Sequence, residues 1–183
     1  MNVRAYETAD ADELWDLKRA FETGLGEAGG ETKRDAYHEK LDDDYRTRWL
    51  GWVERCVDEN PRCVQLAAVE NEEAGGESTP AGESRSATQI AGYVFVLPES
   101  MAFVWDAAVL NEIYVAPRYR GTDVADRLLT AALEVARDQR LPLDRMVLDV
   151  DRENERARAF YRDHGFEHWG EMVARPLDGD ETE

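Results

Sequence analysis

The turn at residues 118–125, RYRGTDVA, has the residue types of a phosphate-binding site. It follows an apolar stretch that ends at Pro117 and precedes apolar residues at helical spacing, so it should open a helix. The first N–H groups of a helix lack partners, and the helix dipole adds partial positive charge there. Gly121 permits close approach of a ligand, and Arg118 and Arg120 add charge. The pattern predicts a phosphate or pyrophosphate site; a helix start that merely contains a glycine is the alternative.

Asp123 is the residue of this turn that conflicts with anion binding, because a carboxylate repels phosphate. In the first turn of a helix, however, acidic residues are favoured by the dipole. We therefore expect the Asp123 side chain to point outward, its amide to remain a donor, and Arg118 or Arg120 to offset its charge. The alternative is a turn that no longer binds phosphate.

A second group of residues lies at 151–166, DRENERARAFYRDHGF. Asn154, Ala157 and Tyr161 are spaced i, i+3 and i+7, so they should share one face of a helix. Asn154 is a favourable N-terminal cap for that helix. Core packing is the usual role of a tyrosine on a helix, but a tyrosine that shares a face with Asn154, one strand beyond a phosphate-type turn, is a candidate site residue.

The elements that must position these residues follow from the apolar spacing. Strands are predicted at 2–7, 63–70, 89–99, 104–117, 144–150 and 167–177. Helices are predicted at 9–24 with Gly24 as the stop, at 32–59 as one long or two shorter helices, at 121–140, and at 154–166 with Gly165 near its end. The aromatic residues of 37–52 are either core or a wall of the substrate site.

These elements predict an α/β (mixed α+β) fold with one mixed sheet flanked by helices. The central strands form antiparallel hairpins, and the β-α-β segment at 107–150 makes a right-handed crossover between parallel strands. One domain covers residues 1–183, with a mobile surface loop at 71–88 and a disordered acidic tail at 178–183.

The composition narrows the class of protein. The 183 residues carry a net charge of −18, which disfavours nucleic acid as a partner. The acidity fits adaptation to high salt (a halophilic protein) or attraction of a cationic substrate. No apolar run suits a membrane span and no signal core is visible, so we expect a cytoplasmic protein. Cys56 and Cys63 are predicted to be free thiols, and no metal site is expected.

The sequence resembles the GNAT (GCN5-related N-acetyltransferase) superfamily over about residues 89–170. Two motifs carry the resemblance: the cofactor turn, filled by Arg120, Gly121, Thr122, Asp123, Val124 and Ala125, and the pattern of Asn154, Ala157, Tyr161, Gly165 and Phe166. The family has a glycine where this chain has Asp123. The resemblance implies a β-α-β core that binds acetyl-CoA and transfer of the acetyl group to an amine.

The resemblance also implies roles for residues. The backbone of Tyr114 and Val115 would pair with the pantetheine arm, and residues 120–125 would hold the pyrophosphate. Asn154 and Ala157 would lie beside the pantetheine or thioester. Tyr161 would be the general acid for the leaving thiolate, since a phenol pKa near ~10 is close to that of a thiol. The amide near Val115 would stabilise the oxyanion.

The general base and the acceptor stay open. Glu112 is the leading base, because it lies two residues before Tyr114 on the same strand face. Asp106 and Asp149 are alternatives, and Asn111 occupies a position that is acidic in some relatives. The acceptor is a small-molecule or peptide amine, and a homodimer is possible. The alternative function is a non-catalytic acyl-CoA-binding regulatory module on the same fold.

Overall fold

The computed structural model describes residues 1–27, 30–70 and 88–173. They fall into two compact units, Met1–Leu148 and the described part of Asp149–Glu183, and each unit is described by itself. The predicted loop at 71–88 lies outside the described residues except for Thr88, and the predicted acidic tail lies wholly outside them.

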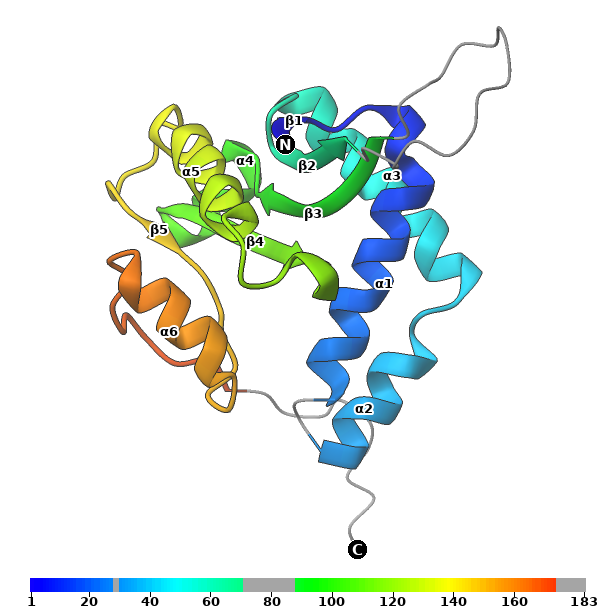
Figure 1. Cartoon of the computed structure of the whole chain (residues 1–183). Coiled ribbons are helices and arrows are strands. Elements are labelled where there is room, and N and C mark those ends of the chain that lie inside the picture. Colours follow the sequence, from blue (N-terminus) through cyan, green and yellow to red (C-terminus); the bar gives the residue numbers. More distant parts are fainter. Residues whose placement is uncertain (28–29, 71–87, 174–183) are drawn as a thin grey trace, which may run out of the picture. The chain divides into compact units, whose positions relative to one another are not determined.

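A five-stranded sheet organises the first unit (Figure 1). Its strands lie side by side in sequence order: β1 (Asn2–Ala5), β2 (Val64–Glu70), β3 (Thr88–Val96), β4 (Ala108–Val115) and β5 (Met146–Val147). The first four pair antiparallel, and β5 runs parallel to β4 beside Ala108 and Val109. The predicted mixed sheet, its hairpins and its parallel β-α-β unit are confirmed.

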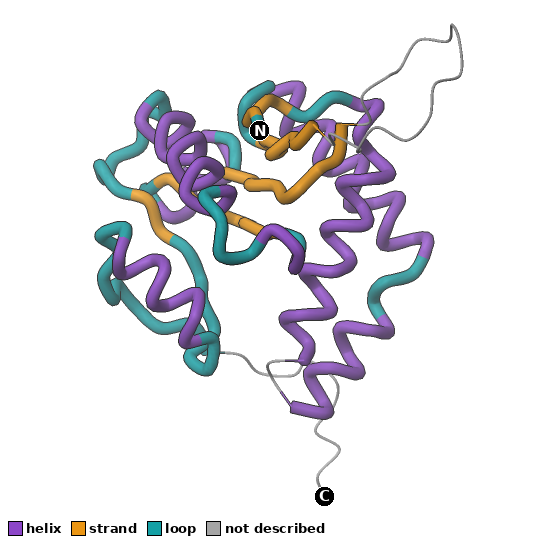
Figure 2. The backbone as a smooth tube through the Cα atoms, viewed as in Figure 1, coloured by secondary structure: helices purple, strands orange, loops and turns teal. Residues whose placement is uncertain are grey.

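Helices cover both faces of this sheet (Figure 2). The helices of this unit are α1 (Ala11–Glu27), α2 (Gly30–Glu39), α3 (Asp43–Glu59), the short α4 (Glu99–Ala102) and α5 (Val124–Arg137), of which α2 packs beside α1 and not on the sheet. Neighbouring residues of β3 show the two faces. Gly92 looks toward Leu128 of α5, whereas Tyr93 belongs to the apolar cluster that α1 and α3 complete. Within the described residues, no helix is long and apolar enough to cross a membrane.

Several of the aromatic residues of 37–52 belong to the apolar core cluster. Trp49 of α3 is buried and lies 6.1 Å from Trp15 of α1, ring centre to ring centre. Trp52 lies 4.9 Å from Phe95 of β3. These contacts bury large apolar areas, and such burial is the main stabilising term in folding. Trp49 and Trp52 are therefore core residues.

The two cysteines are buried free thiols, as predicted. Burial raises the pKa of Cys56 to about 11 and that of Cys63 to about 12. Both thiols therefore stay protonated at neutral pH and are poor nucleophiles.

The first helix runs further than predicted, and the structure decides between the alternatives for the second segment. α1 continues past Gly24 to Glu27, because a glycine inside a helix costs only about 1 kcal/mol and packing outweighs it. Of the two alternatives left open for 32–59, the structure has the two shorter helices. The second begins where the Asp42 carboxylate accepts a hydrogen bond of 2.7 Å from the Tyr45 amide, an N-terminal cap.

Three predicted strands depart most from their expected bounds. The strand at 104–117 begins only at Ala108, because short helical turns precede it and Asp106 has a left-handed φ of 54°. The strand at 144–150 shrinks to Met146–Val147. No strand forms within residues 167–173. Trp169, Met172 and Val173 there are exposed, so no buried apolar face fixes an extended conformation.

Candidate active site

The predicted phosphate-binding turn joins β4 to α5. A short helical turn at Pro117–Tyr119 leads to Gly121, whose φ of +83° favours glycine, and α5 begins at Val124. Among the described residues, the backbone N–H groups of 121–126 have no backbone acceptor. A side chain at Gly121 would meet nothing within 4 Å, so the turn is open there. This arrangement can bind an anion.

Asp123 lies at the N-terminal end of α5 without capping it. Its carboxylate is 2.7 Å from Nε of Arg127, one helical turn along, and both side chains are more than half exposed. The outward orientation of the Asp123 side chain agrees with the expectation. The residue that offsets its charge is Arg127, however, and not Arg118 or Arg120 as expected. Arg118 and Arg120 lie over the rings of Tyr119 and Tyr114 instead. Arg127 is favoured because i, i+4 pairs face each other on a helix.

The end of β4 presents an open backbone edge. β4 pairs with β3 as far as Val115, but β5 covers only Ala108 and Val109 on its other side. Within the described part of the first unit, no strand pairs with residues 110–115 on that side. An extended ligand chain can bind such an edge as an added strand. Tyr114 and Val115 lie on this edge, directly before the turn.

Asn154, Ala157 and Tyr161 share one face of helix α6 (Glu155–Asp163) in the second unit. Asn154 caps the helix as predicted, accepting a hydrogen bond of 3.0 Å from the Ala157 amide. Gly165 ends it with a φ of +81°, and the Phe166 amide donates to the Tyr161 carbonyl oxygen. The sequence therefore fixes this helix by local rules at both ends.

The Tyr161 hydroxyl is a weaker acid than the sequence suggested. Its ring lies 5.5 Å from Phe160 and 5.6 Å from Phe166, centre to centre. Burial raises its pKa to about 12. The expectation of a pKa near ~10 is corrected here, because an apolar environment disfavours the phenolate.

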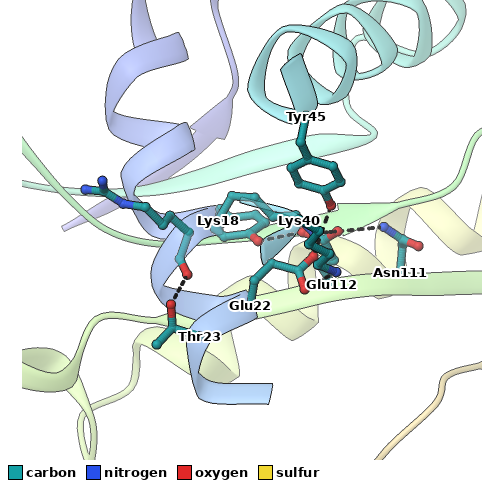
Figure 3. Close-up of polar contacts among 9 residues, drawn as sticks. Lys18, Glu22, Thr23, Lys40, Tyr45, Asn111 and Glu112 are labelled. Carbon is teal, nitrogen blue, oxygen red and sulfur yellow. Dashed lines mark hydrogen bonds and ion pairs between the residues drawn. The ribbon is translucent and has the colours of Figure 1, made fainter. Parts of the chain in front are cut away.

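Glu112, the leading candidate for the general base, is buried in a network of donors (Figure 3). Its carboxylate accepts hydrogen bonds from Lys18 at 2.6 Å, from the Tyr93 hydroxyl at 2.5 Å and from the Asn111 side chain at 3.2 Å. These three donors occupy the carboxylate oxygens and hold them inside the protein, so the carboxylate is not free to meet an incoming amine. The geometry therefore argues against Glu112 as the base. Asp106 and Asp149 are exposed.

A family model described as the Acetyltransferase (GNAT) family matches residues 30–166, most of the chain. The match includes the open turn, the edge of β4 and α6. The chain belongs to the GNAT family. The resemblance found in the two motifs is thereby confirmed, and family membership supports acyl transfer by an acetyltransferase. No curated protein sequence matches this chain.

Solved structures share the GNAT fold with this protein at low identity. An N-acetyltransferase (paia) from Thermoplasma acidophilum, solved with coenzyme A, has a TM-score of 0.62 at 16% identity, covering 91% of this chain and 89% of the other. A ribosomal-protein-alanine N-acetyltransferase from Brucella melitensis has 0.61 at 23%, covering 93% and 86%. An aminoglycoside 6'-N-acetyltransferase from Acinetobacter haemolyticus has 0.58 at 16%, covering 98% and 100%.

Sequence reasoning missed the partners of Glu112 in this GNAT protein. Lys18 and Glu22 are both buried in α1 and lie 2.5 Å apart. Burial opposes the charge on Lys18, but Glu112 and Glu22 outweigh burial and raise its pKa. A signal was present in the sequence: Lys18 and Glu22 fall at i+4 and i+8 from Leu14, on the apolar face of the helix.

No group of three metal-binding side chains occurs within the described residues.

Proposed function

We propose that this protein moves an acetyl group from acetyl-CoA to a primary amine of a small molecule or protein. The observation that carries the proposal is the open turn at 120–125 beside the unpaired edge of β4. Family membership and a GNAT structure solved with coenzyme A support an acyl-CoA ligand. The positive φ of Gly121 and the free amides fit a pyrophosphate, and the edge of β4 fits an extended pantetheine chain.

On this proposal the chain's own residues have separate tasks. The amides of Gly121, Thr122, Asp123, Val124 and Ala125 hold the pyrophosphate, and Arg120, whose own amide donates to the Pro117 carbonyl oxygen, adds the positive charge of its side chain. Backbone groups of Tyr114 and Val115 bind the pantetheine, and the Val115 amide stabilises negative charge on the carbonyl oxygen. Acetyl-CoA supplies an activated acetyl group. The amine nitrogen forms a bond to the carbonyl carbon of the acetyl group, and the carbon–sulfur bond breaks. The nitrogen loses a proton to water or a base.

The family resemblance assigns the remaining groups to residues of α6. Tyr161 gives its proton to the leaving sulfur, while Asn154 and Ala157 form the ligand-facing side of α6. A phenol with a pKa of about 12 is a weak acid toward a thiolate. Its main effect is therefore a hydrogen bond that strengthens as charge develops on the sulfur.

Binding of acetyl-CoA tests the turn. We expect saturable one-site binding by calorimetric titration in both moderate and high potassium chloride. Asp123→Asn should bind up to about fivefold more tightly at moderate salt, because one negative charge is removed from the helix start, and high salt should shrink the difference. Glu134→Gln, the same charge change on an exposed residue later in α5, is the matched control. Absence of binding in either salt would contradict the proposal.

Acetyl transfer by Tyr161→Phe tests the general acid. We expect kcat to fall about 100-fold, at the low end for acid–base catalysis, with little change in the dissociation constant of acetyl-CoA. The donor is the protonated phenol, and its pKa of about 12 keeps it protonated through the alkaline range. The wild-type kcat should therefore show no fall near pH ~10, where an ordinary tyrosine ionises.

Tyr119→Phe is the matched control for this measurement, because it also removes one tyrosine hydroxyl. That hydroxyl belongs to the turn after β4 and donates to the Gln89 side chain of β3 at 2.9 Å. An unchanged kcat for Tyr161→Phe would remove Tyr161 from the chemistry. Binding of acetyl-CoA without transfer to any amine of a broad panel would instead favour the non-catalytic acyl-CoA-binding module.

A further inference from the structure

A buried charge network in the first unit holds more negative than positive charge. Glu22 of α1 and Glu112 of β4 are only 4% and 7% exposed. Between them lies Lys18, whose ammonium is 2.5 Å from Glu22 and 2.6 Å from Glu112 (Figure 3). Two carboxylates and one buried ammonium leave one negative charge without a buried partner. Uncompensated buried charge is costly, so the network needs a second cation.

Lys40 supplies that cation from the protein surface. Its Nζ atom lies 2.7 Å from Oε2 of Glu22, while the Lys40 side chain is 36% exposed. Among the described residues, the same oxygen has no donor in good hydrogen-bond geometry. The contact is therefore an ion pair without an aligned hydrogen bond, and a better-placed ammonium could replace it.

Aromatic rings complete the surroundings of the Lys40 ammonium. It lies 4.1 Å from the centre of the Tyr37 ring and 5.5 Å from that of Tyr45. The Tyr45 hydroxyl donates to Oε1 of Glu22 at 3.2 Å, which fixes the ring beside the carboxylate. Aromatic faces around a carboxylate are the groups that recognise an ammonium ion. Lys18 shows the same preference, 5.2 Å from the Trp49 ring.

We propose that Glu22, Tyr37 and Tyr45 form a binding site for a primary ammonium group, which the Lys40 side chain occupies in this structure and leaves when a cationic ligand binds. Lys40 carries its charge on a long flexible stem, so it can move into solvent without unfolding a helix. The strongly negative charge of the chain raises the local concentration of cationic ligands.

The site has a consequence for the acceptor, and this step rests on the proposed function. An ammonium that lies 2.7 Å from the Glu22 carboxylate and faces aromatic rings is paired with a negative charge, which favours its charged form. A charged ammonium has no lone pair and cannot attack the acetyl group. The group bound here is therefore not the reacting amine. The acceptor class is a molecule with at least two amino groups.

The position of the network supports this assignment. Glu112 belongs to β4 and lies two residues before Tyr114. The Tyr114 ring is 6.2 Å from that of Phe21, which neighbours Glu22 in α1. The ammonium site thus adjoins β4, the strand that carries Tyr114 and Val115. An acceptor whose ammonium group is bound here can extend a second amine toward these two residues.

Chemical rescue of Lys40→Ala tests the site without acetyl-CoA. The substitution removes the atoms of n-propylammonium, so that ion is the probe. At constant ionic strength, n-propylammonium chloride should raise the melting temperature of Lys40→Ala in a saturable way. The apparent affinity of n-propylammonium for Lys40→Ala should exceed its affinity for the wild type about tenfold, the range of a hydrogen bond to a charged group. Neutral n-propanol is the matched ligand control and should have no such effect.

Two further variants keep the test decisive. Tyr37→Leu in the Lys40→Ala background removes one ring without touching the buried carboxylates, and it should weaken n-propylammonium binding. Glu22→Gln in the same background should abolish it. An equal response of wild type and Lys40→Ala, or one that survives both additional substitutions, would overturn the proposal. This readout does not depend on acetyl transfer, so failure of the proposed function and failure of this site are distinguishable.

Discussion

Glu112→Gln is expected to destabilise the protein by about 3 kcal/mol or more, the range for removing one partner of a buried ion pair. The substitution takes a carboxylate from Lys18 and from the Tyr93 hydroxyl, both of which are almost fully buried. Lys18 then keeps only Glu22 as a buried anion. Urea unfolding followed by tryptophan fluorescence measures the loss as a lower midpoint with an unchanged slope.

A double variant separates lost charge pairing from lost shape. Glu112→Leu with Lys18→Met replaces the pair by apolar residues of similar size and should recover part of the stability, since such replacements of buried pairs are often close to neutral. Glu134→Gln on the exposed surface of α5 is the matched charge control, with an effect within about 0.5 kcal/mol. A Glu112→Gln protein with wild-type stability and no transferase activity would restore Glu112 as the general base.

Gly92→Ala is expected to be similarly damaging, at about 3 kcal/mol or more. A Cβ atom at Gly92 would lie 2.3 Å from the carbonyl oxygen of Tyr114 and 3.1 Å from Cα of Val115. Both are backbone atoms of β4, so relief requires the strand to move. Thermal unfolding should show the loss of stability, and titration with acetyl-CoA should show weakened binding, because the displaced residues form the proposed pantetheine edge.

Gly24→Ala is the matched control for this substitution. A Cβ atom there would meet nothing within 4 Å, and the residue lies inside α1. Alanine should therefore stabilise the protein by up to about 1 kcal/mol. If Gly92→Ala instead melts with the wild type and binds acetyl-CoA equally, the close approach of β3 and β4 does not position the edge.

Local rules made several features readable from the sequence. Gly121 and Gly165 have the positive φ values that their places in the motifs required. Asn154 caps α6 because a side-chain oxygen at that position reaches an amide three residues later. The parallel pairing of β4 and β5 followed from the helical crossover that connects them. The homodimer, the cytoplasmic location and the single domain stay predictions.

Other features depended on residues far apart in the chain. The extent of β5 and the absence of a strand within 167–173 could not be read from apolar alternation, because a strand also needs a neighbour to pair with. The pKa of Tyr161 is set by burial, which a helical spacing does not reveal.

The sequence by itself determined the family, the mixed sheet and the open glycine turn before α5, because these rest on short-range spacing of glycine, asparagine and apolar residues. The tertiary structure alone decided the surroundings of Glu112. Its partner Lys18 lies 94 residues away in the chain, and only folding removes both groups from water. A carboxylate is a base or an ion-pair partner according to the charges and solvent around it, and those are properties of the fold.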